Sequence, residues 1–257
     1  MSAPDFAFET EEERHEGDPA EEQPVIGPIG LLKGAVAVGA LTLAVFVLVP
    51  GLDLAIARLF YAGNGQFIGN QLAVFGILRS SFNALFVLTC AVTAVGLFMT
   101  ARTAAQWLGL GIRKWLFITV CLLTGPLVVA NIGFKDHWGR ARPRDIVEFA
   151  GSKAFTAPFP PSNQCTYNCS FVSGEASSVF IVLFVAALLF KSLSRNFVAL
   201  GVLLGGIAGL TRMAQGGHFL SDVIFAGVLM AITGASLQLL FDTLESDREN
   251  SIERSSA

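Results

Sequence analysis

Charged residues are scarce in this chain of 257 amino acids, of which Asp, Glu, Lys and Arg together make up only 14%. A soluble domain of ordinary composition carries about a quarter charged residues. Apolar residues reach 53% and give a mean hydropathy of +0.61. This balance excludes an ordinary soluble domain and predicts a chain embedded in a lipid bilayer. The basic residues are dispersed among apolar segments, so we expect no nucleic-acid partner.

Histidine and cysteine are also rare, with three and four residues respectively. They form no cluster with the spacing of a metal site, so we expect no metal and no other cofactor. Cys90 and Cys121 fall in apolar segments, where a thiol is an ordinary small apolar group. Cys165 and Cys169 lie four residues apart in a long loop. A disulfide there would suit an oxidising compartment, and two free thiols or a transient metal contact are the alternatives.

The N-terminus lacks a basic segment followed by a short apolar one, so no cleavable signal peptide is expected. Residues 1–22 hold nine acidic residues against the single Arg14. Such a segment cannot bury enough apolar surface to fold alone. We therefore expect a disordered acidic tail over residues 1–25, and a second acidic tail over 242–257.

Six apolar segments are long enough to cross about 30 Å of hydrocarbon, which needs about 20 helical residues. Lipid offers the backbone no hydrogen-bond partners, so each crossing segment must be helical. The sequence predicts an all-α integral membrane protein, a six-helix bundle formed by residues 26–241. The predicted spans lie near 29–49, 82–99, 115–134, 174–190, 197–215 and 221–241.

Three local features modify this pattern. The fourth span is short, and Pro126 inside the third span is expected to kink it. Residues 51–80 alternate apolar stretches with charged residues and a Gly-Asn-Gly sequence. We interpret them as an interfacial amphipathic helix followed by a turn.

An even number of spans places both termini on the same side of the membrane. Loop charges do not decide which side, because basic residues occur at both ends of the predicted bundle. If the termini are cytoplasmic, the opposite end faces outward despite its many basic residues. Some of those cations must then be present for chemistry. The end with the termini carries Arg102, Arg113, Lys114, Lys191 and Arg195, and the other carries Arg58, Arg79, Lys135, Arg140, Arg142, Arg144 and Lys153.

Two clusters of polar residues stand at the ends of predicted spans, where charges usually serve pairing or function. Lys135 and Arg142 follow the third span and are about two helical turns apart, so both can project from one face. Ser173, Gly174 and Glu175 open the fourth span. Free amides at a helix N-terminus form a ready anion site, and glycine allows close approach to the backbone. Taken alone, each cluster is also compatible with an ordinary helix end.

A third cluster closes the fifth span and contains Arg212, His218 and Asp222. If the last helix begins here, His218 and Asp222 lie one turn apart on a shared face. The carboxylate can then hold one ring N–H of the histidine and leave the other nitrogen free to attack. The alternative is a histidine that merely contacts a helix-capping aspartate.

Together the three clusters fit phosphoryl transfer. The phosphoryl group in flight spreads negative charge over its oxygens, so catalysis is mainly positioning and fixed positive charge. Three cations and the backbone amides of the second cluster would bind the phosphate, and His218 would be the nucleophile. The proposed donors are Lys135, Arg142, Arg212 and the amides of Ser173 and Gly174.

These residues resemble the signature of the type-2 phosphatidic acid phosphatase superfamily, whose pattern is K-x6-RP, then PSGH, then SR-x5-H-x3-D. Residues Lys135 to Pro143 match the first element in full. Arg212, His218 and Asp222 match the third element, with Thr211 in place of its serine. The resemblance implies a six-span bundle with an outward-facing site, periplasmic in bacteria, and metal-independent dephosphorylation through a phosphohistidine at His218.

The second element departs from the pattern, because Val172 replaces its proline and Glu175 replaces the histidine that protonates the leaving group. A carboxylic acid can donate a proton if burial or a neighbouring phosphate favours its protonated form. We favour Glu175 as a substituted general acid. The alternatives are that His137 has taken this role, or that Glu175 only pairs with a cation and leaving-group protonation is impaired.

The resemblance therefore implies a lipid phosphate phosphatase of a bacterial inner membrane, with both termini cytoplasmic. Lipid A, undecaprenyl pyrophosphate, phosphatidylglycerol phosphate and phosphatidic acid are substrates of such enzymes. Lipid A is preferred here because the long basic loop 144–172 could cover a bulky head group. The alternatives are a lipid-to-lipid phosphotransferase and a non-catalytic protein that binds or transports lipid phosphates. The sequence does not predict the oligomeric state.

Overall fold

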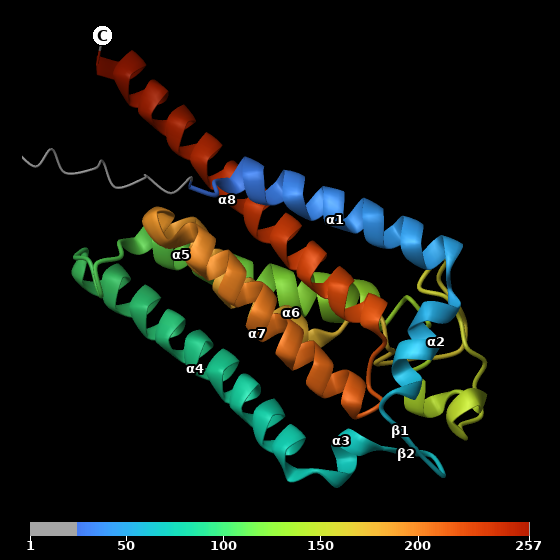
Figure 1. Ribbon diagram of the computed structural model, residues 1–257. Helices are drawn as coiled ribbons and strands as arrows, with labels where there is room; N and C mark the ends of the chain where they lie inside the picture. The colour runs from blue at the N-terminus through green and yellow to red at the C-terminus, as the bar shows by residue number, and fades with distance from the viewer. Residues whose placement is uncertain (1–24, 257) are drawn as a thin grey trace, which may run out of the picture.

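The computed structural model describes residues 25–256, which form a bundle of six long helices with short elements and loops at one end (Figure 1). α1 (Pro28–Leu48) and α8 (Leu220–Ser256) run side by side along one face. α4 (Ala73–Thr103) lies on the opposite side, and α6 (Gly174–Leu189) lies between them. The remaining elements are α2 (Gly51–Arg58), β1 (Tyr61–Gly63), β2 (Gln66–Phe67), α3 (Ile68–Gln71), α5 (Ile112–Leu122), the π-helical η1 (Leu123–Lys135), the short 3-10 helices η2 (Pro143–Asp145), η3 (Val147–Phe149) and η4 (Lys191–Leu193), and α7 (Ser194–Ala214).

Most of these helices can cross a membrane by length and composition. Within the described residues, five helical stretches meet this requirement, and α6 is a shorter apolar helix of 16 residues. The prediction of an all-α six-helix membrane bundle with a short fourth span is confirmed. The five long stretches are Pro28–Leu48, Ala73–Thr103, Ile112–Lys135, Lys191–Ala214 and Leu220–Arg254.

α6 is the central helix of the bundle. It packs against α7, α8, α5 and η1, and most of its residues are buried. Its sequence is apolar on all sides after Ser178, as expected for a helix surrounded by other helices. The N-terminal end of α6 is therefore held firmly where the polar clusters meet.

The boundaries of some elements differ from those expected. Between 51 and 80, the amphipathic helix is α2, which is followed by the antiparallel β1–β2 hairpin. The second span then begins at Ala73, well before residue 82, because apolar residues on both sides of Arg79 extend the helix. α8 continues as one helix through residue 242 to Ser256. The predicted N-terminal tail falls almost wholly outside the described residues.

Near Pro126 the third span changes from an α-helix to a π-helix. α5 becomes the π-helical η1 at Leu123, three residues before the proline. Proline lacks an N–H donor, and π-helical turns accommodate such a disruption. The side-chain amide of Asn131 donates to the carbonyl of Pro126 at 2.8 Å, which satisfies this acceptor. The widened helix then delivers Lys135 to the end of the span.

The two ends of the bundle differ in character. The beginning of α1, the α4–α5 and α6–α7 connections and the end of α8 gather at one end (Figure 1). At the other end lie α2, the β1–β2 hairpin, α3, the loop between η1 and α6, and the turn between α7 and α8. We call this second end the site end, because all three predicted clusters are found there.

Candidate active site

His218 lies in the turn between α7 and α8 and is only 1% exposed. Two glycines make this turn. Gly216 has a φ of +64°, and a Cβ there would lie 2.6 Å from the ring of Phe67. A Cβ at Gly217 would lie 2.8 Å from Nη2 of Arg212. Larger residues would therefore push the turn away from its neighbours and shift the histidine ring.

A backbone carbonyl fixes the orientation of the His218 ring. Nδ1 lies 2.6 Å from the carbonyl oxygen of Ser170, which can only accept, so Nδ1 carries the proton. The nearest carboxylate oxygen of Asp222 is 3.8 Å from Nδ1, too far for a hydrogen bond. In this structure Ser170 therefore accepts the ring N–H, and Asp222 acts on the ring mainly through its charge. Its carboxylate is occupied by the hydroxyl of Ser170, the amide of Phe219 and Arg140.

The other ring nitrogen is available for chemistry. Burial lowers the pKa of His218 to about 4, against the opposing effect of the nearby Asp222 carboxylate. The ring is therefore neutral at neutral pH, with a lone pair on Nε2. This atom is buried and has no hydrogen-bond partner within residues 25–256. The carboxylate of Glu175 lies 4.0 Å from this atom.

Glu175 is at the centre of the predicted cations. One carboxylate oxygen lies 3.2 Å from Nε of Arg212, and the other lies 3.2 Å from Arg79 on α4. Lys135 interacts electrostatically with Glu175, Arg142 and Arg212. An arrangement that gathers several cations around one carboxylate beside a histidine can also receive a phosphate group.

The absence of a side chain at Gly174 leaves room for the amino group of Lys135 beside the start of α6. A Cβ at Gly174 would lie 2.8 Å from Nζ of Lys135 and 3.4 Å from the side-chain oxygen of Asn131. Any larger residue would therefore displace the lysine head group. The sequence correctly placed Lys135 and Gly174 near each other, although they belong to different spans.

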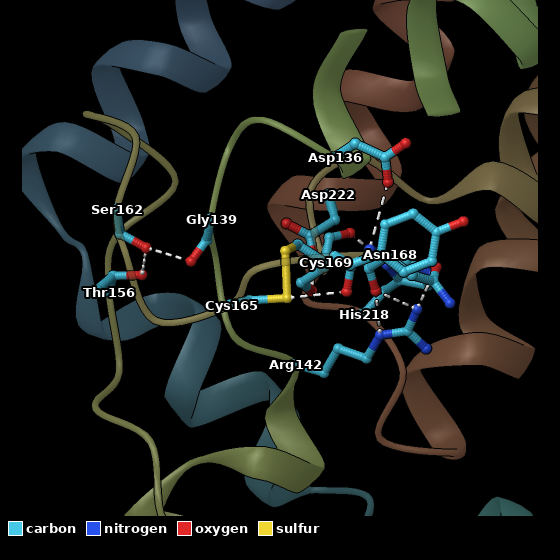
Figure 2. Close-up of a disulfide and its surroundings, with 12 residues drawn as sticks. Asp136, Gly139, Arg142, Thr156, Ser162, Cys165, Asn168, Cys169, His218 and Asp222 are labelled. Atoms are coloured by element: carbon cyan, nitrogen blue, oxygen red, sulfur yellow. Dashed lines mark hydrogen bonds and ion pairs between the residues drawn. A yellow bond between two sulfur atoms is a disulfide. The ribbon is translucent and has the colours of Figure 1, made fainter. Parts of the chain in front are cut away.

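Arg142 is held by the loop that precedes α6. Its guanidinium donates to the backbone carbonyl of Asn168 at 2.7 Å and to the side-chain oxygen of the same residue at 2.7 Å. Burial lowers the pKa of Arg142, assisted by the neighbouring Arg144, yet an arginine remains charged. Figure 2 shows this loop, with its Cys165–Cys169 disulfide, next to Arg142 and His218.

The N-terminus of α6 differs from the expected anion site. Ser173 precedes the helix, but its amide donates to the backbone carbonyl of Asp222 at 3.2 Å. The prediction of a free Ser173 amide is wrong, because the chain before α6 pairs with the first turn of α8. The hydroxyl of Ser173 is instead buried without a hydrogen-bond partner among the described residues. It is the group of Ser173 that remains available to a ligand.

Three functional candidates were missed by the sequence argument. Arg140 is 1% exposed and bridges Asp53, at 2.7 Å, and Asp222, at 2.6 Å. Asp53 also accepts from the amide of Ser221 at 3.0 Å. Arg79, about half exposed, contacts Glu175. Asp53 and Arg79 both interrupt apolar stretches of the sequence. A charged residue in such a place is costly and usually functional, so this feature could have identified both residues.

The other residues considered from the sequence are His137 and the four cysteines. His137 is exposed, and its Nδ1 lies 2.7 Å from the carbonyl of Ile132. Cys165 and Cys169 form a disulfide with their Cα atoms 5.6 Å apart, while Cys90 and Cys121 are free. No group of three or more potential metal-ligating side chains occurs within residues 25–256.

Comparison with known proteins gives one family and several named relatives. A family model described as the PAP2 superfamily matches residues 113–244. A lipid A 4'-phosphatase of Francisella tularensis subsp. novicida is 41% identical over 192 residues, covering 73% of this chain and 85% of that protein. A lipid A 4'-phosphatase of Rhizobium leguminosarum is 29% identical over 82% of this chain and 96% of its own length.

A lipid A 1-phosphatase of Rhizobium etli is 36% identical over 56% of this chain and 60% of that protein. No solved structure matches the chain. The family match covers the last four helices of the bundle and all three polar clusters. As its motifs predicted, this chain belongs to the PAP2 superfamily.

Proposed function

We propose that the chain is a lipid A phosphatase of a bacterial inner membrane that transfers the substrate phosphate to His218 before water releases it. Its family and its relatives make it a membrane lipid phosphatase of the PAP2 type. The relatives that cover most of the chain are lipid A 4'-phosphatases, which favours the 4'-phosphate as the reacting group. The long loop between η1 and α6 is consistent with a large head group.

The observation that supports this mechanism most directly is the state of the His218 ring. It is neutral, its Nδ1 proton is fixed by Ser170, and its Nε2 has no partner within the described chain. A nucleophile needs such a lone pair, held in one direction. Lys135 interacts electrostatically with the ring, and Arg212 pairs with the Glu175 carboxylate, which lies 4.0 Å from Nε2. Both cations can stabilise charge on the phosphoryl oxygens.

The reaction proceeds in two displacements. The Nε2 lone pair attacks phosphorus, a P–N bond forms, and the bond from phosphorus to the lipid oxygen breaks. The lipid oxygen takes a proton and leaves as a hydroxyl. Water then attacks phosphorus, the P–N bond breaks, and the proton that the water loses passes to the carboxylate of the acid that served the first step. The ring is neutral again, and inorganic phosphate leaves. Lys135, Arg142 and Arg212 hold the phosphoryl oxygens through both steps.

Glu175 is our candidate for the proton donor. In the structure its carboxylate pairs with Arg212 and Arg79, so it stands where an anionic phosphate would bind. A phosphate that takes over these arginines leaves Glu175 beside an anion and without its counter-charges. Both changes favour the protonated form of the carboxyl group, which can then donate. Glu175 would be a positioned acid only in the loaded site.

We further propose that the site end faces the periplasm, and that both termini are cytoplasmic. The disulfide between Cys165 and Cys169 supports this orientation, since disulfides persist in oxidising compartments. Several cations at the site end also form contacts inside the protein. Arg140, Arg142 and Arg212 each contact a carboxylate or a carbonyl inside the protein. They are retained for the site and do not report orientation.

The experiment is phosphate release from lipid A by purified protein, with His218→Ala and Arg58→Ala as the test and control variants. Arg58 is an exposed cation at the site end on α2. We expect loss of turnover for His218→Ala and wild-type turnover for Arg58→Ala. Trapping of labelled phosphate on the wild-type protein after a non-acidic quench would support the intermediate. Turnover by His218→Ala at the wild-type rate would exclude it.

The same assay tests whether Glu175, which replaces the histidine of the family pattern, donates the proton. We expect Glu175→Gln to slow lipid release by about a hundredfold, because an amide cannot donate the proton in the same way. Glu175→His should retain much more activity than Glu175→Gln. Equal activity of the Gln variant and the wild type would show that Glu175 is not the acid.

A further inference from the structure

Residues of the loop between η1 and α6 form a polar cavity of about 360 Å³. Its lining includes Arg144, Asp145, Lys153, Gln164 and Tyr167. None of these residues takes part in the phosphoryl transfer described above. We call this space the outer cavity.

The outer cavity is attached to the catalytic turn. The amide of Arg144 donates to the carbonyl of Gly216 at 3.1 Å, two residues before His218. The guanidinium of Arg144 also interacts electrostatically with Arg142 and Arg212, two of the cations of the phosphate site. Arg144 therefore links the outer cavity to the catalytic turn through its backbone and to the phosphate site through its charge.

The cations of the outer cavity stand on an ordered backbone. The amides of Ser152 and Lys153 both donate to the carbonyl of Asp145, at 3.0 and 2.8 Å. The amide of Val147 donates to the carbonyl of Lys153 at 2.9 Å. These bonds hold the backbone of Lys153 beside Asp145 and Val147, so that Lys153 and Arg144 line the same cavity although nine residues separate them in the chain.

Arg144, Lys153 and Tyr167 line the outer cavity with exposed side chains, whereas the side-chain amide of Gln164 is already bonded to Ala154 and Asn163. The ion pair between Arg144 and Asp145 is 3.8 Å long, and both side chains are about half exposed, so it contributes little. Tyr167 is 75% exposed and presents an apolar ring with a hydroxyl group. Two cations and an exposed aromatic ring are suited to a sugar that carries an anionic group.

We propose that the outer cavity binds the phosphorylated sugar of the head group that lies away from the reacting phosphate. This inference rests on the proposed lipid A phosphatase function. With one phosphate beside His218, the positive charges of Arg144 and Lys153 would attract the rest of a bisphosphorylated disaccharide. A lipid phosphate without a sugar would leave the outer cavity empty. The outer cavity would then be the part of the protein that distinguishes the two substrates.

The test compares kcat/KM for bisphosphorylated lipid A with kcat/KM for phosphatidic acid in the same detergent micelles. Arg144→Ala and Lys153→Ala should each lower the ratio of the two values about fivefold to tenfold, as expected for one lost charge-assisted contact. Asp145→Asn removes the only carboxylate among the residues that line the outer cavity, within residues 25–256, and should raise the ratio. Arg58→Ala, on α2 and outside the outer cavity, should leave it unchanged.

The outcomes separate the two proposals. Wild-type protein that hydrolyses phosphatidic acid but not lipid A would overturn the proposed substrate, and this inference with it. Wild-type protein active on lipid A, with the same ratio in all four variants, would overturn this inference alone. A fall in the ratio for Arg58→Ala as large as that for Arg144→Ala would likewise overturn it, because general surface charge would then explain the effect.

Discussion

At the level of single residues, Arg140 joins the catalytic turn to the rest of the site end. Its two guanidinium nitrogens reach Asp53 on α2 and Asp222 on α8, and its plane lies 4.2 Å from the centre of the Phe219 ring. A lysine could not serve both carboxylates, because it carries its charge at a single point. The histidine is therefore oriented indirectly, through Asp222, Ser170 and this arginine.

Replacing Arg140 should destabilise the protein strongly. Arg140→Met keeps much of the side-chain volume but leaves the buried carboxylates of Asp53 and Asp222 unpaired. Removal of one partner of a buried ion pair costs about 3–5 kcal/mol. We expect a clear fall in the unfolding temperature in detergent, whereas Arg58→Met at an exposed position should change it little. Equal unfolding temperatures for the two variants would contradict the buried network.

The His218 ring gives a prediction about pH. With labelled histidine, the ring signal that disappears in His218→Ala should titrate with a midpoint near pH 4, because burial disfavours the charged ring. Unfolded chains bind this proton near pH 6.5. The folded state therefore loses stability as pH falls from about 6.5 towards 4, and the ring is a nucleophile only above its folded pKa. A midpoint near 6.5 in the folded protein would show that the ring is solvated.

At the level of elements, small residues on α7 allow close packing of three helices. A Cβ at Gly205 would lie 2.6 Å from the Phe180 ring on α6, and one at Gly209 would lie 2.1 Å from the side chain of Val223 on α8. Helices in membranes associate through such close contacts between small residues. The contacts of α7 with α6 and α8 fix the distance between Arg212, Glu175 and His218.

Neighbouring glycines of α7 offer a matched comparison. Gly209→Ala inserts a methyl group into the side chain of Val223, and overpacking of this kind costs about 1–3 kcal/mol. Gly206→Ala on the same helix meets nothing within 4 Å. We expect a lower unfolding temperature and reduced turnover for Gly209→Ala only. Similar losses in both variants would mean that helix propensity or another general effect is responsible.

The segment from Cys165 to Ser170 is a second element that positions catalytic groups. Asn168 holds Arg142 (Figure 2). Ser170 holds both His218 and Asp222. The disulfide closes the chain just before Ser170. We expect that Cys169→Ser, or reduction of the wild type, lowers kcat about tenfold by loosening these contacts.

Reductant should not change the kcat of Cys169→Ser, which lacks the disulfide. Cys90→Ser should have the same kcat as the wild type and the same response to reductant. If reduction leaves the wild-type kcat unchanged, the contacts of Asn168 and Ser170 hold the segment without the disulfide.

Features that are local in the chain could be predicted from the sequence, whereas contacts between distant residues could not. Helices and clusters were predictable because hydropathy and motif spacing are local in the chain. The fixed tautomer of His218 was assigned to Asp222, since a carboxylate four residues away was the only local partner. The actual partner is the carbonyl of Ser170, 48 residues away. Likewise, Arg140 and Asp53 are 87 residues apart, and only the folded chain brings them together.

At the level of the whole molecule, the bundle separates two chemically different ends. The site end holds the disulfide, the outer cavity and the buried charges (Figure 1). At the opposite end, α8 extends beyond the apolar part of the bundle, and Arg113 pairs there with Glu245. The chain thus keeps its catalytic groups at the end remote from the beginning of α1 and the end of α8.

This arrangement predicts the topology that the proposed function requires. Single cysteines at Lys153 and at Lys191, introduced into protein without its four native cysteines, should react differently with an impermeant maleimide on intact cells. Position 153 lies at the site end and should be labelled from the periplasm, whereas position 191 lies between α6 and α7 and should be labelled only after the inner membrane is broken. Labelling of position 191 before lysis, with protection of position 153, would place the site on the cytoplasmic face. Lipid A in the outer leaflet would then be out of reach, and the substrate assignment would fail together with the orientation.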